Sequence, residues 1–208
     1  MDTQPILVEV PEELHGERIV VRPYRREDAV ALWDAVQESR EHLAPWLPWV
    51  QGYRSLDDAR AYVARAHARW ELREDMAYGI FAREDGRLLG GTGLHDIDWS
   101  LRTFEIGYWI RRTAVGRGYV SEAVQALTRL AFEQLGANRV QIRIQPRNER
   151  SRCVAEGLGF LLEGTLRRSA PGVDGTARDM HVYALIPEDY HNLPWVGRQA
   201  HDAQVEGG

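Results

Sequence analysis

The hydrophobic and polar positions of the first part of the chain alternate with two different periods. Residues 17 to 24 are rich in β-branched side chains and predict a strand, and residues 26 to 43 carry apolar side chains at near-helical spacing. Ser55 and Asp58 form the sequence signature of a capping box, and an apolar stripe from Ala59 to Trp70 follows them. The pattern therefore predicts a strand followed by two helices.

The pattern changes to that of strands after this point and later alternates again. Residues 76 to 110 are expected to form three strands, and sequential hairpins make this part antiparallel. The elements predicted after them are a helix over 118 to 135, a strand over 138 to 145, a helix over 148 to 160 that ends near Gly157, and a hairpin of residues 159 to 168 and 177 to 185. The predicted order is therefore β-α-α-β-β-β-α-β-α-β-β.

The length of the chain favours one domain. With 208 residues and 44% apolar composition, the chain can bury a sizeable core. We expect the domain to span residues 1–190. Residues 191–208 contain a proline, small polar side chains and a diglycine end, so they are expected to form a flexible C-terminal tail.

Charge and cysteine content argue against several classes of protein. The chain has 26 Lys+Arg against 31 Asp+Glu, a net charge of -5, which argues against general binding of nucleic acid or anionic membrane. One cysteine permits no intramolecular disulfide and no cysteine-based zinc site. The N-terminus lacks a signal pattern, and no apolar run approaches the about 18 residues of a membrane span. We expect a soluble, cytoplasmic protein.

The stretch EIGYWIRRTAVGRGYVSEA, residues 105 to 123, predicts a strand, a glycine turn and the start of a helix. The turn fits neither the dinucleotide-binding pattern, because Ser121 stands at the third glycine position, nor the P-loop pattern. A glycine turn that enters a helix presents unpaired backbone N–H groups, which suit a pyrophosphate. Taken alone, Gly116 and Gly118 are better explained by a tight strand-to-helix turn.

Several separated segments decide between these two explanations. YWIRRTAVGRGYVSEAVQAL, NRVQIRIQPRNERSRCVAEGLGF and LEGTLR follow one another in the order and spacing of the GNAT superfamily of acetyl-CoA-dependent N-acetyltransferases, which the chain resembles over roughly residues 14 to 186. GERIVVRPYRREDA, SREHLAPWLPWV and FEIGYWI resemble its RimJ/RimL-like branch, which acetylates the N-termini of ribosomal proteins. The resemblance implies an α/β (α+β) GNAT fold: a mixed, strongly twisted sheet of about seven strands, helices on both faces, and splayed central strands.

The resemblance also implies a cofactor loop. The family pattern Q/R-x-x-G-x-G/A maps onto residues 115 to 120, so the residues expected to bind acetyl-CoA (CoA) are Trp109, Ile110, Val115, Gly116, Arg117, Gly118, Tyr119, Val120, Asn148 and Ser151. Val115 replaces Gln or Arg, and Val120 replaces Gly or Ala. Because backbone amides do most of the binding, Val115 is expected to cost little, whereas Val120 could crowd the phosphate.

Glu105 is the residue expected to accept a proton. Glu105 lies in an otherwise apolar or aromatic strand, where partial burial would strengthen it as a general base acting through a water. The alternative is a structural salt bridge or a solvated strand edge. By resemblance, the backbone N–H near Ile110 would stabilise the developing oxyanion.

The residue that protonates the leaving thiolate in many members of the family is absent from this chain. Many relatives have a tyrosine four positions after the position of Ser151, and Ala155 stands there in this chain. By resemblance Ser151 inherits a role near the sulfur, and Asn148 is expected to bind the pantetheine arm. Ser151 could instead be a first-turn serine that bonds its own backbone.

The acceptor side is the least specified. Trp46 and Trp49 lie in a proline-restricted loop that, by resemblance, borders the acceptor groove, although they could equally be anchors that pack the loop on the core. His95 is expected to bind substrate or to neighbour Glu105, and no metal is expected. We expect acetyl transfer to a primary amine, most of all a protein N-terminus, by direct attack in a ternary complex, and a possible homodimer. A small amine such as a polyamine or an aminoglycoside, or a non-catalytic acyl-CoA-binding protein, are the alternatives.

Overall fold

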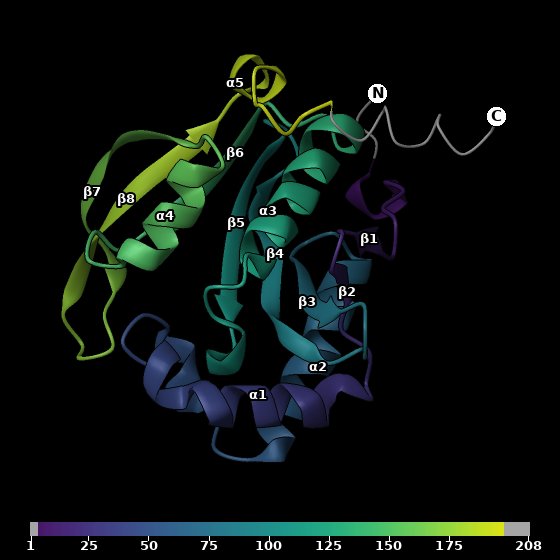
Figure 1. Ribbon diagram of the computed structural model, residues 1–208, viewed down its shortest axis with the longest axis vertical. Helices are drawn as coiled ribbons and strands as arrows, with labels where there is room; N and C mark the ends of the chain where they lie inside the picture. The colour runs from purple at the N-terminus through teal and green to yellow at the C-terminus, as the bar shows by residue number, and fades with distance from the viewer. Residues whose placement is uncertain (1–3, 198–208) are drawn as a thin grey trace.

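The computed structural model describes residues 4–197, and a single eight-stranded sheet runs through them (Figure 1). The strands lie in the order β1-β2-β3-β4-β5-β6-β8-β7. Their bounds are β1 Leu14–His15, β2 Ile19–Pro23, β3 Met76–Ala82, β4 Leu88–Asp98, β5 Thr103–Ile110, β6 Arg139–Ile144, β7 Leu161–Pro171 and β8 Ala177–Leu185. All neighbours are antiparallel except β5 and β6, which are parallel.

Helices cover both faces of the sheet. They are α1 Asp28–Leu43, α2 Leu56–Glu71, α3 Tyr119–Arg129, α4 Glu149–Gly157 and α5 Pro187–His191, and a π-helical turn, Leu130–Gln134, extends α3. Each element predicted from the hydrophobic pattern is present, and the mixed sheet with helices is confirmed. The sequence did not predict β1 or α5, and β1 raises the strand count from about seven to eight.

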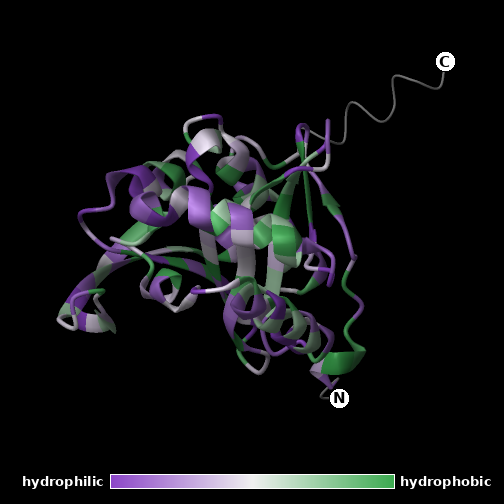
Figure 2. Cartoon of the chain, turned by 90° about the horizontal axis from the view of Figure 1, so that it is seen from below, coloured by the Kyte–Doolittle hydropathy of each residue, from purple (hydrophilic) through white to green (hydrophobic). Residues whose placement is uncertain are grey.

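Two hydrophobic clusters fix the layers. One lies between the sheet and α3, and the other lies between the sheet, α1 and α2. Strand β3 contributes to both because its side chains alternate: Met76, Tyr78 and Ile80 enter the first cluster and Ala77 the second. In Figure 2 the helices carry both hydrophobic and hydrophilic residues, as expected of elements that bury one side.

The capping box predicted for α2 is present. The backbone N–H of Ser55 donates to the Asp58 carboxylate at 2.8 Å. At α1, Asp28 accepts hydrogen bonds from Arg22 in β2, at 2.7 and 2.9 Å. The first contact caps α2, and the second ties the start of α1 to the sheet.

Part of the predicted tail packs on the domain. The Trp195 indole donates to the Leu158 carbonyl at 3.1 Å, and Arg129 of α3 donates to the Trp195 carbonyl at 2.7 Å. The remainder of the predicted tail, residues 198–208, lies outside the described residues. Within residues 4–197, no helix is long and apolar enough to cross a membrane.

The parallel strands β5 and β6 separate after a short contact. They pair only from Thr103 to Glu105, opposite Arg139 to Gln141. Beyond this point β5 stays paired with β4 and β6 stays paired with β8, so the two strands diverge (Figure 1). The splayed central strands expected from the resemblance are present, and the opening between them positions the site.

Candidate active site

A large cavity of about 770 Å³ opens beside the diverging strands. Its wall includes the end of β5, the loop before α3 and the first turn of α4. Of the predicted cofactor residues, this cavity is lined by Trp109, Ile110, Val115, Gly116, Gly118, Tyr119, Val120, Asn148 and Ser151. Arg117 is exposed and is not among the lining residues, so the structure does not bring it into the cavity.

The loop before α3 has the geometry of an anion site. Gly116 and Gly118 have φ of 77° and 82°, a conformation that side chains other than glycine rarely adopt, and no atom lies within 4 Å of a Cβ built on Gly116. Gly118 is the N-cap of α3, where backbone N–H groups lack helical partners. The loop therefore leaves space and donors for a pyrophosphate.

Positive charge gathers at this cavity. Arg147 and Arg150 are among its lining residues, together with His42 and one carboxylate, Glu149. Burial, together with the charges of Arg150 and Arg112, lowers the pKa of His42 and favours its neutral form, so the positive charge comes from the two arginines. Val120, which the sequence suggested could crowd a phosphate, is half-buried and packs against the core cluster below α3. The residues present thus fit an anionic, phosphate-bearing cofactor.

Ser151 is joined to a tyrosine that sequence reasoning missed. The Ser151 hydroxyl donates to the Tyr108 oxygen at 2.9 Å, and the Tyr108 hydroxyl donates to the Ser151 carbonyl at 2.9 Å. Asn148 caps α4 by accepting from the Ser151 N–H at 3.2 Å. Burial raises the pKa of Tyr108 to about 12, although the bond to Ser151 opposes the rise. A protonated phenol from β5 therefore stands beside the serine.

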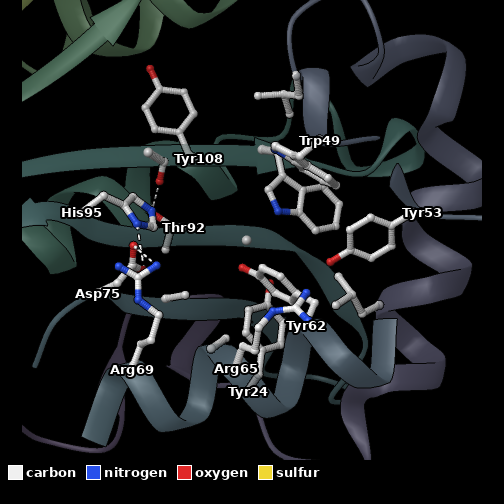
Figure 3. Close-up of a pocket in the computed structure, with 17 residues that line it drawn as sticks. Tyr24, Trp49, Tyr53, Tyr62, Arg65, Arg69, Asp75, Thr92, His95 and Tyr108 are labelled. Carbon is white, nitrogen blue, oxygen red and sulfur yellow. Dashed lines mark hydrogen bonds and ion pairs between the residues drawn. The ribbon is translucent and has the colours of Figure 1, made fainter. Parts of the chain in front are cut away.

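A second cavity, of about 450 Å³, lies on the α1 and α2 side of the sheet (Figure 3). Aromatic side chains dominate its wall: Tyr24, Trp49, Tyr53, Tyr62 and Trp109. Their rings pack edge to face, as between Trp49 and Trp109 with centroids 5.9 Å apart. The charged lining residues are Arg65, Arg69 and Asp75. His95 and Thr92 lie at the end of the cavity that holds Asp75 and Arg69.

The two cavities meet. Leu47, Tyr108 and Trp109 line both of them. Trp49 and His95, predicted to bind substrate, line the smaller cavity, whereas Trp46 lines only the larger one. The two cavities therefore adjoin at Tyr108 and Trp109, at the edge of the opening between β5 and β6.

Glu105 is held by strand β6. Gln141 donates to its carboxylate at 3.0 Å, and the Arg143 Nε lies 2.5 Å from the same oxygen, Oε2. Arg143 also pairs with Asp96 at 2.7 Å. Glu105 lines neither cavity, so the salt-bridge alternative from the sequence describes its contacts, and its role as a base stays a prediction.

Comparison with known proteins identifies the family. A model of the "Acetyltransferase (GNAT) domain" matches residues 18–161, which is more than half of the chain. The chain belongs to the GNAT acetyltransferase family. Membership and the geometry together make it an acetyl-CoA-dependent N-acetyltransferase, and the larger cavity fits CoA. An acyltransferase, rather than a non-catalytic acyl-CoA-binding protein, is therefore the established class.

Several relatives of this acetyltransferase carry names that refer to ribosomes or ribosomal proteins. A Bacillus subtilis (strain 168) protein named "Putative ribosomal N-acetyltransferase YdaF" is 34% identical over 177 residues, covering 84% of this chain and 94% of the relative. The Escherichia coli (strain K12) ribosomal-protein-serine acetyltransferase is 30% identical over 158 residues, covering 74% and 85%. The solved structure of RimL, a ribosomal L7/L12 alpha-N-protein acetyltransferase in complex with coenzyme A, superposes with a TM-score of 0.78 at 25% identity, covering 84% and 98%. The RimJ/RimL-like resemblance is confirmed.

Proposed function

We propose that this enzyme acetylates the α-amine of a protein or peptide N-terminus by direct transfer in a ternary complex. The observation that carries the proposal is the meeting of the two cavities at Tyr108 and Trp109. Bound acetyl-CoA supplies an activated acetyl thioester. An amine in the aromatic cavity would reach it without a covalent enzyme intermediate.

The charges of the aromatic cavity favour a peptide over a polyamine or an aminoglycoside. Such polycations need several carboxylates, but of the 17 lining residues only Asp75 is acidic, and it is already in contact with Arg69 and His95. The aromatic walls would pack against the apolar part of a peptide's first residue. An α-amine, with a pKa of about 8, also loses its proton more easily than a lysine at about 10.4.

The backbone of β5 supplies a donor for the thioester oxygen. The Arg111 N–H bonds to the Leu89 carbonyl in β4 at 2.8 Å. Because alternate residues of a strand direct their N–H groups to opposite edges, the Ile110 N–H faces the opening between β5 and β6. Ile110 is thus proposed as the oxyanion donor, and Ser151 with Tyr108 as the pair that solvates or protonates the leaving thiolate.

The test is acetyl-CoA-dependent thiol release with a matched panel of acceptors. The panel contains short peptides with N-terminal Ser, Ala or Met, the same peptides with blocked N-termini, spermidine and an aminoglycoside. The proposal expects release with the free peptides and none with the blocked ones. Release with spermidine or the aminoglycoside alone would overturn the peptide assignment and leave the acetyltransferase class intact.

A homodimer is proposed on the exposed strand β7. Leu161, Leu162 and Leu166 are 56%, 53% and 48% exposed on this edge strand, and a second copy that pairs with the strand would cover these apolar side chains. Light scattering after size exclusion should give twice the monomer mass at micromolar concentration. A monomer at that concentration would contradict the dimer.

The names of the relatives also support action on ribosomal proteins in the cytoplasm.

A further inference from the structure

His95 and Asp75 form a pair inside the aromatic cavity. The His95 Nδ1 lies 3.1 Å from Asp75 Oδ1, and the Arg69 Nη1 lies 3.5 Å from Asp75 Oδ2 (Figure 3). A carboxylate accepts hydrogen bonds, so the proton of a neutral His95 stays on Nδ1. Nε2 then carries the lone pair, as a proton acceptor requires.

Two glycines make room for the imidazole on the sheet. A Cβ at Gly93 would lie 2.7 Å from the His95 Nε2, and one at Gly107 would lie 3.3 Å from it. The ring therefore lies across β4 and β5, with Nε2 close to both strands. Gly107 precedes Tyr108 and Trp109, which border the junction of the cavities. The lone pair is thus on the acceptor side of that junction.

Glu105 does not compete for this position. It stands directly opposite His95 in the strand register, but its carboxylate is held by Gln141 and Arg143 of β6. It lines neither cavity, whereas His95 and Asp75 line the smaller one. Of the two residues, only His95 lines the cavity that is proposed to hold the amine.

We propose that the His95 Nε2, oriented by Asp75, accepts the proton of the acceptor amine, an inference that rests on the proposed function. The α-ammonium gives one proton to Nε2, and the freed nitrogen lone pair forms the N–C bond to the acetyl carbon. The C–S bond breaks, its electron pair leaves with sulfur, and the thiolate takes up one proton. The second amine proton is lost as the amide forms, so one proton is released overall. Asp75 is a positioning residue.

The kinetic test compares His95→Gln with Glu105→Gln and uses His67→Gln, an exposed histidine on α2, as the matched control. General-base catalysis contributes about 100-fold or more, so His95→Gln should lower kcat for the best accepted amine by about that factor. The Kd for acetyl-CoA should stay at the wild-type value, which also reports intact folding. His67→Gln should remain within about threefold of wild type, and Glu105→Gln, which tests the competing assignment, should lower kcat by less than His95→Gln does. Loss of turnover in Glu105→Gln with His95→Gln near wild type would overturn the assignment.

A spectroscopic test needs no acceptor. Long-range ¹H–¹⁵N NMR of the wild type, with His95 assigned by difference from His95→Gln, should show neutral His95 protonated on Nδ1, and Asp75→Asn should shift the population toward the Nε2–H tautomer. A wild-type Nε2–H tautomer would overturn the inference. Wild type that acetylates only small amines would refute the proposed peptide acceptor, while the ratios between variants still test His95.

Discussion

Removal of the Glu38 carboxylate should destabilise the fold, because this carboxylate binds the segment that leads from β5 to the cofactor loop. Glu38 on α1 accepts from Arg111 at 3.0 and 2.6 Å and from Thr113 at 3.2 and 2.8 Å. Arg111 is only 8% exposed, and its remaining partner is the Leu88 carbonyl at 2.9 Å. In Glu38→Ala the buried guanidinium would keep that one acceptor.

The magnitude follows from the burial of the two partners. Breaking a fully buried ion pair costs about 3–5 kcal/mol. The Glu38 side chain is 26% exposed, so water replaces part of the loss, and about 2–3 kcal/mol is expected. At about 2–4 °C per kcal/mol for a chain of this size, Tm should fall by about 5–10 °C. The exposed Glu41 on the same helix is the control, and Glu41→Ala should change stability by less than about 0.5 kcal/mol.

The loss should also depend on pH. Burial raises the pKa of Glu38, but hydrogen bonds from Arg111 and Thr113 outweigh it and lower the pKa. A lowered folded-state pKa means that the carboxylate stabilises the fold above its unfolded pKa and stops doing so as the pH falls through the folded value. Thermal unfolding should therefore show a difference between wild type and Glu38→Ala at neutral pH that shrinks below about pH 4. A Tm within about 1 °C of wild type at pH 7, or a difference that grows in acid, would refute the reasoning.

Three further changes test other parts of the site. Gly116→Ala and Gly136→Ala both place a Cβ at positive φ with no neighbour within 4 Å, so each should lower the free energy of unfolding by about 1–2 kcal/mol. Only Gly116→Ala should raise the KM for acetyl-CoA, and equal KM values for the two variants would contradict the anion site. Tyr108→Phe removes the hydroxyl that bonds Ser151 and should lower kcat by about tenfold or less. Ser151→Ala should lower kcat less in the Tyr108→Phe background than in wild type, and additive losses would mean that the two residues act separately. Trp49→Ala should raise the KM for peptide and leave the KM for acetyl-CoA unchanged, because Trp49 lines only the smaller cavity; a change in both would place Trp49 in the cofactor site.

Local signals made the fold predictable. The helix after Ser55 was found because its cap and its apolar stripe lie within one stretch of sequence, and the same holds for the turn at Gly116. Strand β1 was missed because two residues are too few to show a period. The separation of β5 from β6 was predicted only from the family motifs, because no local sequence pattern indicates it.

The site was predictable only where motifs name single residues. Tyr108 was missed because its partner Ser151 lies 43 positions away and a tyrosine in a strand has no distinctive signal. The pair of His95 with Asp75 spans 20 positions and forms only when β3 and β4 align. For Glu105 the sequence predicted a base, but the side chains that hold it come from β6, so burial alone was an incomplete guide.

The central claim is transfer to an N-terminal α-amine at the junction of the two cavities. The most direct measurement is tandem mass spectrometry of a peptide that offers both a free N-terminal serine and an internal lysine, after incubation with enzyme and acetyl-CoA. The account predicts one acetyl group, on the N-terminal nitrogen, and an unmodified lysine. Acetylation of the lysine with a free N-terminus left unmodified would contradict it.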